Sequence, residues 1–316
     1  MTHYLISRLL QLIPVLFVLS ILVFGIFRIL PGDRALLLMP LDATPEELER
    51  ARRVLGLDRP IPIQYIEWLG RVLQGNFGVS QGDDRPVVQL LGKAIVPTLQ
   101  LGVTGLVLGI LLAVPMGILG AIRHGSWIDY LVRSISLIGF AVPTFWLALL
   151  LMLLFSIRLR VLPVAGYAAL WQDPVSSLRH MALPTAVIGI SSAAALMRFL
   201  RASLLEVLGQ DYVRTARSKG LSGQVVILRH ALANALIPFT TIVGLQVGAL
   251  LSGAAILEMI FAWPGIGWLT LQAIWQRDYD IVQGATLMMG LSFVLVNLAV
   301  DVLYAYLDPR IKYVKE

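Results

Sequence analysis

The sequence predicts an all-α polytopic membrane protein with about six transmembrane helices. Hydrophobic residues make up 58% of the 316 residues, charged residues make up only 14%, and the mean hydropathy is +0.81. Soluble domains are typically about 45–50% apolar and about 25% charged, so most of this chain must lie in lipid. Apolar stretches of the length that crosses a bilayer recur along the chain. Basic residues collect between alternate stretches, as they do in the inner loops of membrane proteins.

Six stretches have the length and low charge of a membrane-spanning helix, which needs about 20 apolar residues. The predicted spans are 9–30, 99–121, 130–156, 183–200, 237–262 and 284–307. The third is the longest, and we expect it to be tilted or to begin outside the lipid. The first span follows Arg8 and resembles a signal peptide, but it is too long and no small-residue cleavage site follows at Pro31-Gly32-Asp33. We therefore expect it to be retained.

The distribution of Lys and Arg orients the chain. If the N-terminus lies inside, the inner segments hold most of the basic residues and the short outer loops hold few, which satisfies the positive-inside rule. The inner basic residues are then Arg8, Arg123, Arg133, Arg198, Arg201, Arg214, Arg217, Lys219, Arg229, Arg310, Lys312 and Lys315. Both termini are therefore expected on the cytoplasmic side of a bacterial inner membrane. The net charge of +6 is explained by these loops beside membrane lipids, and we expect no nucleic-acid partner.

This layout divides the chain into four parts. Residues 1–30 are the N-terminal cytoplasmic end and the first span, and residues 31–98 are a helical periplasmic loop. Residues 99–307 are the membrane core with the other five spans, including a cytoplasmic segment at 201–236, and residues 308–316 are a cytoplasmic tail. The loop and the cytoplasmic segment are longer than connections need to be, so function is sought there first.

The periplasmic loop opens with a strongly signalled helix. Thr44 is the expected N-cap, Pro45 the first helical residue, and Glu47 the partner of Thr44 in a capping box. Gly56 is expected to end the helix. Its apolar face is formed by Leu48, Ala51 and Leu55.

A second helix in this loop is predicted by apolar residues at helical spacing before Gly75, namely Ile63, Ile66, Leu69 and Leu73. Two interpretations of the loop stay open. It is a cap that packs on the outer ends of the spans, or a docking platform for an external partner, or both. The candidate docking residues are Glu46, Arg53 and Trp68.

The cytoplasmic segment contains a short basic helix. Asp211 is the expected N-cap, residues 212–219 form about two turns, and Gly220 ends them. A helix this short is marginal in water, so it must lean on the membrane surface or on another protein. The spacing of its residues does not choose between the two.

No catalytic, metal or cofactor site is predicted in this chain. It has no Cys, which removes thiol nucleophiles and thiolate metal sites. The four histidines, His3, His124, His180 and His230, show no pair at helical spacing for metal ligation. No nucleophile with its base and no carboxylate pair stands out within the spans.

Few ionisable residues fall inside the predicted spans. Arg28 and Glu258 lie near the outer ends, where a capped helix end or a snorkelling side chain explains them, and Asp301 lies beside Asn297 in the sixth span. An ion-coupled secondary transporter usually carries such residues near the midplane in two related halves, and no such pattern is seen. A channel subunit is the harder alternative to exclude, but a channel has no need of a basic inner helix.

The basic inner helix resembles a known motif. Residues 211–221 read Asp-Tyr-Val-Arg-Thr-Ala-Arg-Ser-Lys-Gly-Leu, and His230, Asn234 and Pro238 follow. This string resembles the cytoplasmic coupling loop of permease subunits of binding-protein-dependent ABC transporters, in the group that carries dipeptides, oligopeptides, nickel and glutathione-like solutes.

The resemblance extends in order along the whole chain, and the joint order of the strings is far more specific than any one of them. The matching strings are Arg8-Leu9-Leu10, Ile13-Pro14, Pro31-Gly32-Asp33, Leu55-Gly56-Leu57-Asp58, Gln64-Tyr65, Gly75-Asn76-Phe77-Gly78-Val79-Ser80, Pro97-Thr98-Leu99, and Glu258 with Phe261-Ala262-Trp263-Pro264-Gly265-Ile266-Gly267. In the wider superfamily the coupling loop has Glu-Ala-Ala, three residues and Gly. Here Arg214 and Thr215 replace the first two residues, while Ala216 and Gly220 remain.

The resemblance implies an ABC importer type I permease fold. It implies that the chain forms half of a translocation path for peptides or peptide-like solutes, with a second homologous permease, two ATPase subunits and an external solute-binding protein as partners. The implied ATPase-coupling residues are Tyr212, Arg214, Thr215, Ala216, Arg217, Lys219, Gly220 and Leu221. The implied periplasmic gate residues are Glu258, Phe261, Trp263, Pro264 and Gly265.

The chain itself is not expected to hydrolyse ATP. Its string at 221–224 lacks one Gly of the ATPase signature, and no glycine-rich phosphate loop followed by Lys and Ser or Thr is present. Gly265-Ile266-Gly267 is not a dinucleotide loop, because no strand precedes it and Thr270 stands where the third Gly belongs. ATP and Mg²⁺ are thus expected in the partner ATPases.

Overall fold

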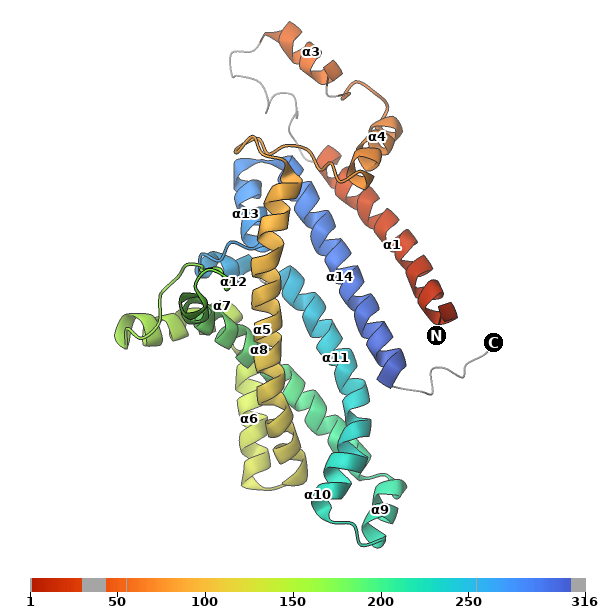
Figure 1. Ribbon diagram of the computed structural model, residues 1–316, viewed down its shortest axis with the longest axis vertical. Coiled ribbons are helices and arrows are strands. Elements are labelled where there is room, and N and C mark those ends of the chain that lie inside the picture. The colour runs from red at the N-terminus through yellow and green to blue at the C-terminus, as the bar shows by residue number, and fades with distance from the viewer. Residues whose placement is uncertain (1, 30–43, 55, 254, 308–316) are drawn as a thin grey trace.

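The computed structural model describes residues 2–29, 44–54, 56–253 and 255–307, and this part of the chain is almost entirely helical (Figure 1). In chain order the elements are α1 (Thr2–Ile29), α3 (Pro45–Val54), α4 (Ile61–Leu73), α5 (Val87–Ile122), α6 (Trp127–Ala141), α7 (Thr144–Leu151), η1 (Met152–Arg158), α8 (Pro174–Leu208), α9 (Asp211–Ser218), α10 (Gly223–Val225), η2 (Val226–Ala231), α11 (Leu232–Gly253), α12 (Ala255–Ile260), α13 (Ile266–Gln276) and α14 (Tyr279–Leu307). Here η marks a π-helical turn. The all-α class is confirmed.

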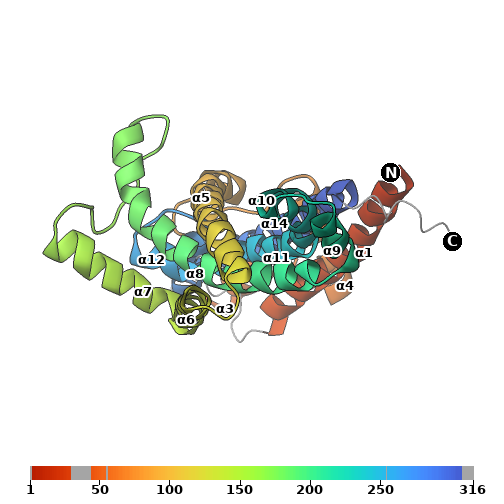
Figure 2. The same ribbon diagram turned by 90° about the horizontal axis from the view of Figure 1, so that it is seen from below.

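The long helices form a broad layer rather than a round bundle. In Figure 1 the segment with α3 and α4 lies at one end of the long axis, and α9 and α10 lie at the other. Viewed from below, α7 and α1 lie at opposite edges of the layer (Figure 2). The two soluble segments predicted from the sequence therefore occupy opposite ends of the molecule.

The predicted number of spans agrees with the helices that are described. Five helical segments are long and apolar enough to cross a membrane: α1, α5, α8, the continuous run from α10 through η2 into α11, and α14. A sixth crossing results if α6 and the α7–η1 segment count as one bent span.

The predicted third span, 130–156, is not one helix. Its two halves meet at an angle of 101° between Ala141 and Thr144. Pro143 has no N–H to donate, and it keeps Val142 out of the helical region, where that residue has φ −76° and ψ 122°. The prediction of one continuous helix, tilted or beginning outside the lipid, was therefore wrong about the continuity of this segment.

Other span boundaries also differ from the prediction, and α8 (Pro174–Leu208) extends well beyond the predicted 183–200 at both ends. The predicted second span starts at Leu99, but α5 starts at Val87, because Val87, Leu91 and Ala94 pack against α13 and α14 and extend the helix beyond the apolar stretch. The predicted fifth span, 237–262, is divided between α11 and α12, and residue 254 lies outside the described part.

The centre of the layer is the contact between α5 and α8, where small residues let the helices approach closely. A Cβ added at Gly105 would overlap Ile188, and one added at Gly109 would lie 2.9 Å from Cβ of Ser192. Close packing through small residues is the usual basis of helix association in membranes, where burial gives little driving force. The α5–α8 pair is therefore the closely packed centre against which other helices of the layer lie.

The 31–98 segment is partly packed on the first span. Trp68 of α4 is buried beside Phe24 of α1, and the Tyr65 hydroxyl lies 2.7 Å from Oγ of Ser20. Here the predicted cap is observed. Residues 30–43 and Leu55, and with them the Pro31-Gly32-Asp33 string, lie outside the described residues.

Candidate functional site

Helix α9 is the predicted basic helix, with one correction at its start. Asp211 is the first helical residue and not the N-cap; Gln210 holds the N-cap position without a side-chain hydrogen bond. An acidic residue in the first turn still complements the positive end of the helix dipole. At the other end Lys219 is the C-cap and Gly220 follows with φ +77°, so the predicted stop is confirmed.

The inner face of α9 packs on its own chain. Val213 and Ala216 are buried with Val226 of η2, against Val207 and Leu208 at the end of α8. Asn234 of α11 donates from Nδ2 to the Tyr212 hydroxyl at 3.0 Å. The ends of α8 and α11 therefore hold this short helix. Ala216, predicted as a coupling residue, lies on the buried face.

The opposite face of α9 is exposed and basic. Arg214, Arg217 and Lys219 lie on it, and Thr215, Gly220 and Leu221 are also exposed. Arg214 lies 3.7 Å from Asp211, which is itself almost fully exposed, so this ion pair leaves the face positively charged. No heavy atom would lie within 4 Å of a Cβ at Gly220, so its restriction is the positive φ and not crowding by the chain.

The predicted gate residues form a compact junction between α12 and α13. Glu258 of α12 is fully buried. Its carboxylate accepts from the Thr98 hydroxyl of α5 at 2.6 Å and from the backbone N–H of Trp268 at 2.8 Å. The Thr98 oxygen in turn accepts from the N–H of Ile266 at 2.8 Å. Glu258 and Thr98 thus satisfy free N–H groups at the start of α13.

Trp263 closes the other side of this junction. It is fully buried, its indole Nε1 donates to the carbonyl of Pro97 at 2.9 Å, and its ring makes a T-shaped contact with Tyr167 at a centroid distance of 4.8 Å. Phe261 is also buried, and its carbonyl accepts from the N–H of Gly166 at 2.8 Å. Pro264 is the exposed member of the predicted set.

The glycines of the junction are required for space. A Cβ at Gly265 would overlap the Glu258 carboxylate, and a Cβ at Gly267 would lie 2.5 Å from Cα of Ala255. The Gly-x-Gly string is therefore explained by close approach of α12 and α13. These glycines thus serve helix packing and not the binding of a dinucleotide.

Sequence reasoning missed three polar anchors. Thr98 appeared only within a matching string, and its bond to Glu258 spans 160 residues. Asp278 is fully buried at the start of α14, where it accepts from the Ser80 hydroxyl at 2.7 Å and from the N–H of Gln81 at 2.8 Å. Asp129 of α6 is fully buried in a bidentate ion pair with Arg201 of α8. Thr98 and Asp129 carry no local sequence signal for these partners, whereas Asp278 has one: it directly precedes α14 and accepts from the N–H of Ile281 at 3.2 Å, as an N-cap does.

The candidate docking residues have different surroundings. Glu46 and Arg53 are exposed on α3, a helix in which no residue is buried. Its capping box is confirmed: the N–H of Thr44 donates to Glu47 at 2.8 Å, and this bond and the one from the Thr44 hydroxyl lower the pKa of Glu47. Trp68 is a correction, because it is buried beside Phe24 and lines a cavity between α1, α3 and α4 instead of standing exposed as Glu46 and Arg53 do.

Arg28 and Asp301 are the other ionisable residues that the sequence placed within the spans. The guanidinium of Arg28 lies 5.2 Å from the centre of the Phe24 ring. Asp301 belongs to α14, and its side chain lies outside the described part. Among the described residues, no group of three or more His, Asp or Glu side chains is placed to hold a metal ion.

Comparison with known proteins decides the family. Residues 105–313 match the binding-protein-dependent transport system inner membrane component, and residues 1–94 match the N-terminal part of such membrane components. The chain belongs to this family. The resemblance found in the sequence is thereby confirmed, and the family is one of transport permeases rather than of enzymes.

Close relatives match over their full length. The glutathione transport system permease protein GsiC of Escherichia coli (strain K12) is 42% identical over 313 residues, which cover 99% of this chain and 100% of the relative. The protein of the same name from Shigella dysenteriae serotype 1 (strain Sd197) matches equally well.

Solved structures place the fold among ABC importer permeases. Two crystal forms of the inward-facing MetNI methionine ABC transporter give TM-scores of 0.56 and 0.58 at 16% identity, covering 70% of this chain and 97% of that chain. Family and fold together make this chain a translocation-pathway subunit of an ABC importer in the peptide and glutathione group, and a multi-pass protein of the inner membrane.

Proposed function

We propose that this permease forms half of the path for short peptides, with a second homologous permease supplying the other half. One of two ATPase subunits binds the exposed basic face of α9, the other binds the sister permease, and an external solute-binding protein delivers cargo at the α3–α4 end. The observation that carries this proposal is the geometry of α9. One face is held by the ends of α8 and α11, so a push on the other face is transmitted to the spans.

Glutathione, or a small peptide of similar size and charge, is the cargo that we propose. The support is the full-length identity to permeases whose name is that of a glutathione transport system. The cargo-contacting residues are expected to come from both permeases, because each lines only half of the path.

The orientation that we propose puts α9 and both termini in the cytoplasm, with α3 and α4 outside. It is supported by the basic residues at the α9 end and by the positions of the two soluble segments at opposite ends of the molecule (Figure 1). The α12–α13 junction then lies toward the outer side. We propose that it forms part of the outer gate, since Glu258, Thr98 and Trp263 make α12, α13 and α5 move together.

Uptake by proteoliposomes tests this function. The chain is co-expressed with its sister permease and ATPases, reconstituted, and supplied with the binding protein and labelled glutathione. We expect uptake that requires ATP hydrolysis on the ATPase side and is competed by short peptides. Dissipating proton and sodium gradients should leave uptake unchanged.

Two results would overturn the proposal. Uptake that persists without ATP and follows an ion gradient would make the chain part of a secondary transporter. Rapid equilibration of small solutes that depends neither on ATP nor on the binding protein would make it a channel subunit. ATP-driven uptake of a different cargo would support the importer function and contradict only the proposal that glutathione is the cargo.

A further inference from the structure

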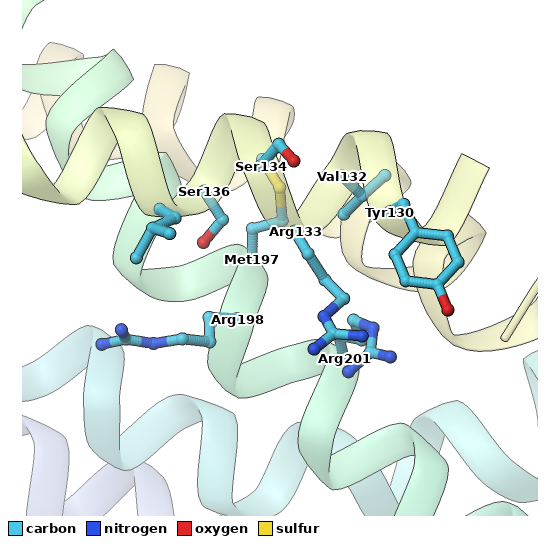
Figure 3. A pocket seen from close by; sticks show the side chains of 9 residues that line it. Tyr130, Val132, Arg133, Ser134, Ser136, Met197, Arg198 and Arg201 are labelled. Atoms are coloured by element: carbon cyan, nitrogen blue, oxygen red, sulfur yellow. The ribbon is translucent and has the colours of Figure 1, made fainter. Parts of the chain in front are cut away.

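A basic pocket lies between α6 and α8 (Figure 3), and no residue of the α12–α13 junction lines it. Its volume is about 370 Å³. Three arginines line it, Arg133 from α6 and Arg198 and Arg201 from α8, together with Tyr130 and Ser134. No acidic side chain is among the lining residues. In Figure 3 Arg133 and Arg201 point toward the same end of the pocket, and Arg198 points away from them.

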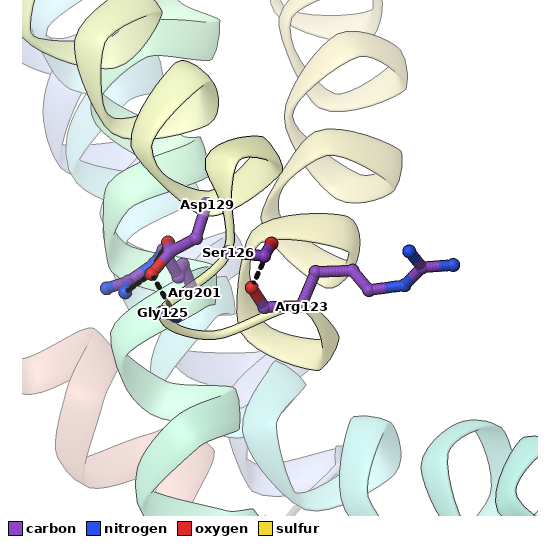
Figure 4. Close-up of polar contacts among 5 residues, drawn as sticks. All are labelled: Arg123, Gly125, Ser126, Asp129 and Arg201. Carbon is purple, nitrogen blue, oxygen red and sulfur yellow. Dashed lines mark hydrogen bonds and ion pairs between the residues drawn. The ribbon is translucent and has the colours of Figure 1, made fainter.

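Arg201 is fixed in the wall of this pocket by Asp129. Its Nε donates to Oδ1 of Asp129 at 2.6 Å and a terminal nitrogen donates to Oδ2 at 2.8 Å, while the N–H of Gly125 donates to Oδ2 at 3.1 Å (Figure 4). Asp129 is fully buried. The pair is neutral as a whole, and it joins α6 to α8 with a defined geometry.

Arg133 and Arg198 have no acidic partner among the described residues. Each lies over an aromatic ring instead: Arg133 is 5.8 Å from the centre of Tyr130, and Arg198 is 4.7 Å from the centre of Phe140. Stacking of this kind holds the guanidinium plane and leaves its N–H groups free to donate in that plane. The pocket thus presents two uncompensated positive charges with free donors.

The Arg133 end of the pocket lies near the start of α6, whereas Arg198 reaches Phe140 in the last turn of that helix. Arg133 lies in the second turn of α6, about 9 Å from the start of the helix at Trp127. Trp127 and Tyr130 are 73% and 60% exposed, as in the aromatic belts at membrane interfaces. Leu131, Leu137 and Ile138 are also exposed on α6 and offer an apolar surface beside the arginines.

We propose that this pocket binds the phosphate of an anionic phospholipid from the inner leaflet. The Arg133 guanidinium, beside Arg201, donates to the phosphate oxygens, and the acyl chains lie along the apolar surface of α6. Basic pockets between membrane helices on the cytoplasmic side are suited to such headgroups. The leaflet assigned rests on the orientation proposed above. The site itself is independent of the cargo.

The test is lipid binding by the complete reconstituted complex. Phosphatidylglycerol is titrated against phosphatidylcholine with the same acyl chains, and bound lipid is counted by native mass spectrometry. We expect phosphatidylglycerol to be retained preferentially. Arg133→Gln should weaken this retention about fivefold, the effect of one basic residue near a charged membrane surface. Arg198→Gln should weaken it less, because the Arg198 side chain points away from Arg133. Arg133→Lys, which keeps the charge, should lose less.

Arg123→Gln is the matched control, because Arg123 carries the same charge in the neighbouring loop and its side chain points away from the Asp129–Arg201 pair (Figure 4). It should leave retention unchanged. Arg201 is not varied, since its loss would leave Asp129 buried without a partner. Equal retention of the two lipids, or an equal effect of Arg123→Gln, would overturn the proposal. So would unchanged lipid retention with lost glutathione uptake in Arg133→Gln, which would assign these arginines to the cargo path.

Discussion

Glu258 shows how a single buried carboxylate is accommodated without a cation. No ion pair to it is present among the described residues, yet its side chain is fully buried. It is stabilised by the Thr98 hydroxyl and by an N–H at the start of α13, where the helix dipole favours negative charge. The same bonds bring together three segments of the chain, and the glycines at 265 and 267 leave the space they need. One residue therefore positions a whole junction.

We expect Glu258→Gln to destabilise the complex by about 1–3 kcal/mol, because the amide has nearly the same shape but can accept with only one oxygen and leaves a buried N–H or hydroxyl poorly satisfied. Thr98→Val should cost a similar amount. Thermal unfolding of the purified complex measures both. Asp83→Asn, which removes an exposed carboxylate, is the control and should change little. Equal melting temperatures for Glu258→Gln and Asp83→Asn would contradict the positioning role.

At the scale of elements, the short helix α9 is stable because of its surroundings rather than its own length. Eight residues give too few intrahelical bonds to persist alone, and the buried contacts of Val213 and Ala216 supply what is missing. The sequence left open whether this helix packs on the membrane surface or on protein. For one face of the helix the answer is protein, because that face packs on other parts of the same chain. The basic face remains for the proposed ATPase contact.

Gly220→Val should loosen or uncouple the ATPases while leaving the chain inserted and paired. A β-branched residue at φ +77° is strained by about 1–2 kcal/mol and adds bulk next to the exposed face. Substrate-stimulated ATP hydrolysis and co-purification of the ATPases measure the effect. Gly223→Val is the matched control, because Gly223 is equally uncrowded and its φ is not positive. Parent-level hydrolysis and transport in Gly220→Val would remove the coupling role.

Helix α3 has no buried residue, so its charged side chains are open to a partner. We expect the double exchange Glu46→Arg with Arg53→Glu, which keeps the net charge, to slow delivery by the binding protein, because exposed charges mainly tune encounter rates. The dependence of transport rate on binding-protein concentration, at low and high salt, measures this. Co-purification of the ATPases should be unaffected. If the transport rate is unchanged at low salt, α3 has no part in docking.

For the whole molecule, features that depend on neighbouring residues were predicted from the sequence, whereas contacts between distant segments were not. The Thr44–Glu47 capping box and the helix end at Gly220 depend on residues a few positions apart, and both were predicted from the sequence. The break at Pro143 also had a local cause and was overlooked within a long apolar stretch. The burial of Trp68 against α1 and the bond from Thr98 to Glu258 depend on how remote segments meet, which hydropathy does not encode.

The bent pair α6 and α7–η1 decides the topology of the whole chain, and labelling can test it because the sequence has no Cys. Single Cys residues are introduced as Asp83→Cys, Gln172→Cys and Lys219→Cys, all at exposed positions, and treated with a membrane-impermeant maleimide. Asp83 is chosen for the outer loop because it is exposed, whereas Gln81, two residues before it, is only partly exposed and would react less readily.

If the bent pair crosses the membrane, α5, the pair and α8 make an odd number of crossings between positions 83 and 219. Asp83→Cys and Gln172→Cys should then react in intact cells, and Lys219→Cys only after permeabilisation. If the pair re-enters on one side instead, positions 83 and 219 would lie on the same side, and the six-span arrangement would be wrong. Reaction of Lys219→Cys alone in intact cells would invert the orientation, and the basic pocket between α6 and α8 would then face the outer leaflet.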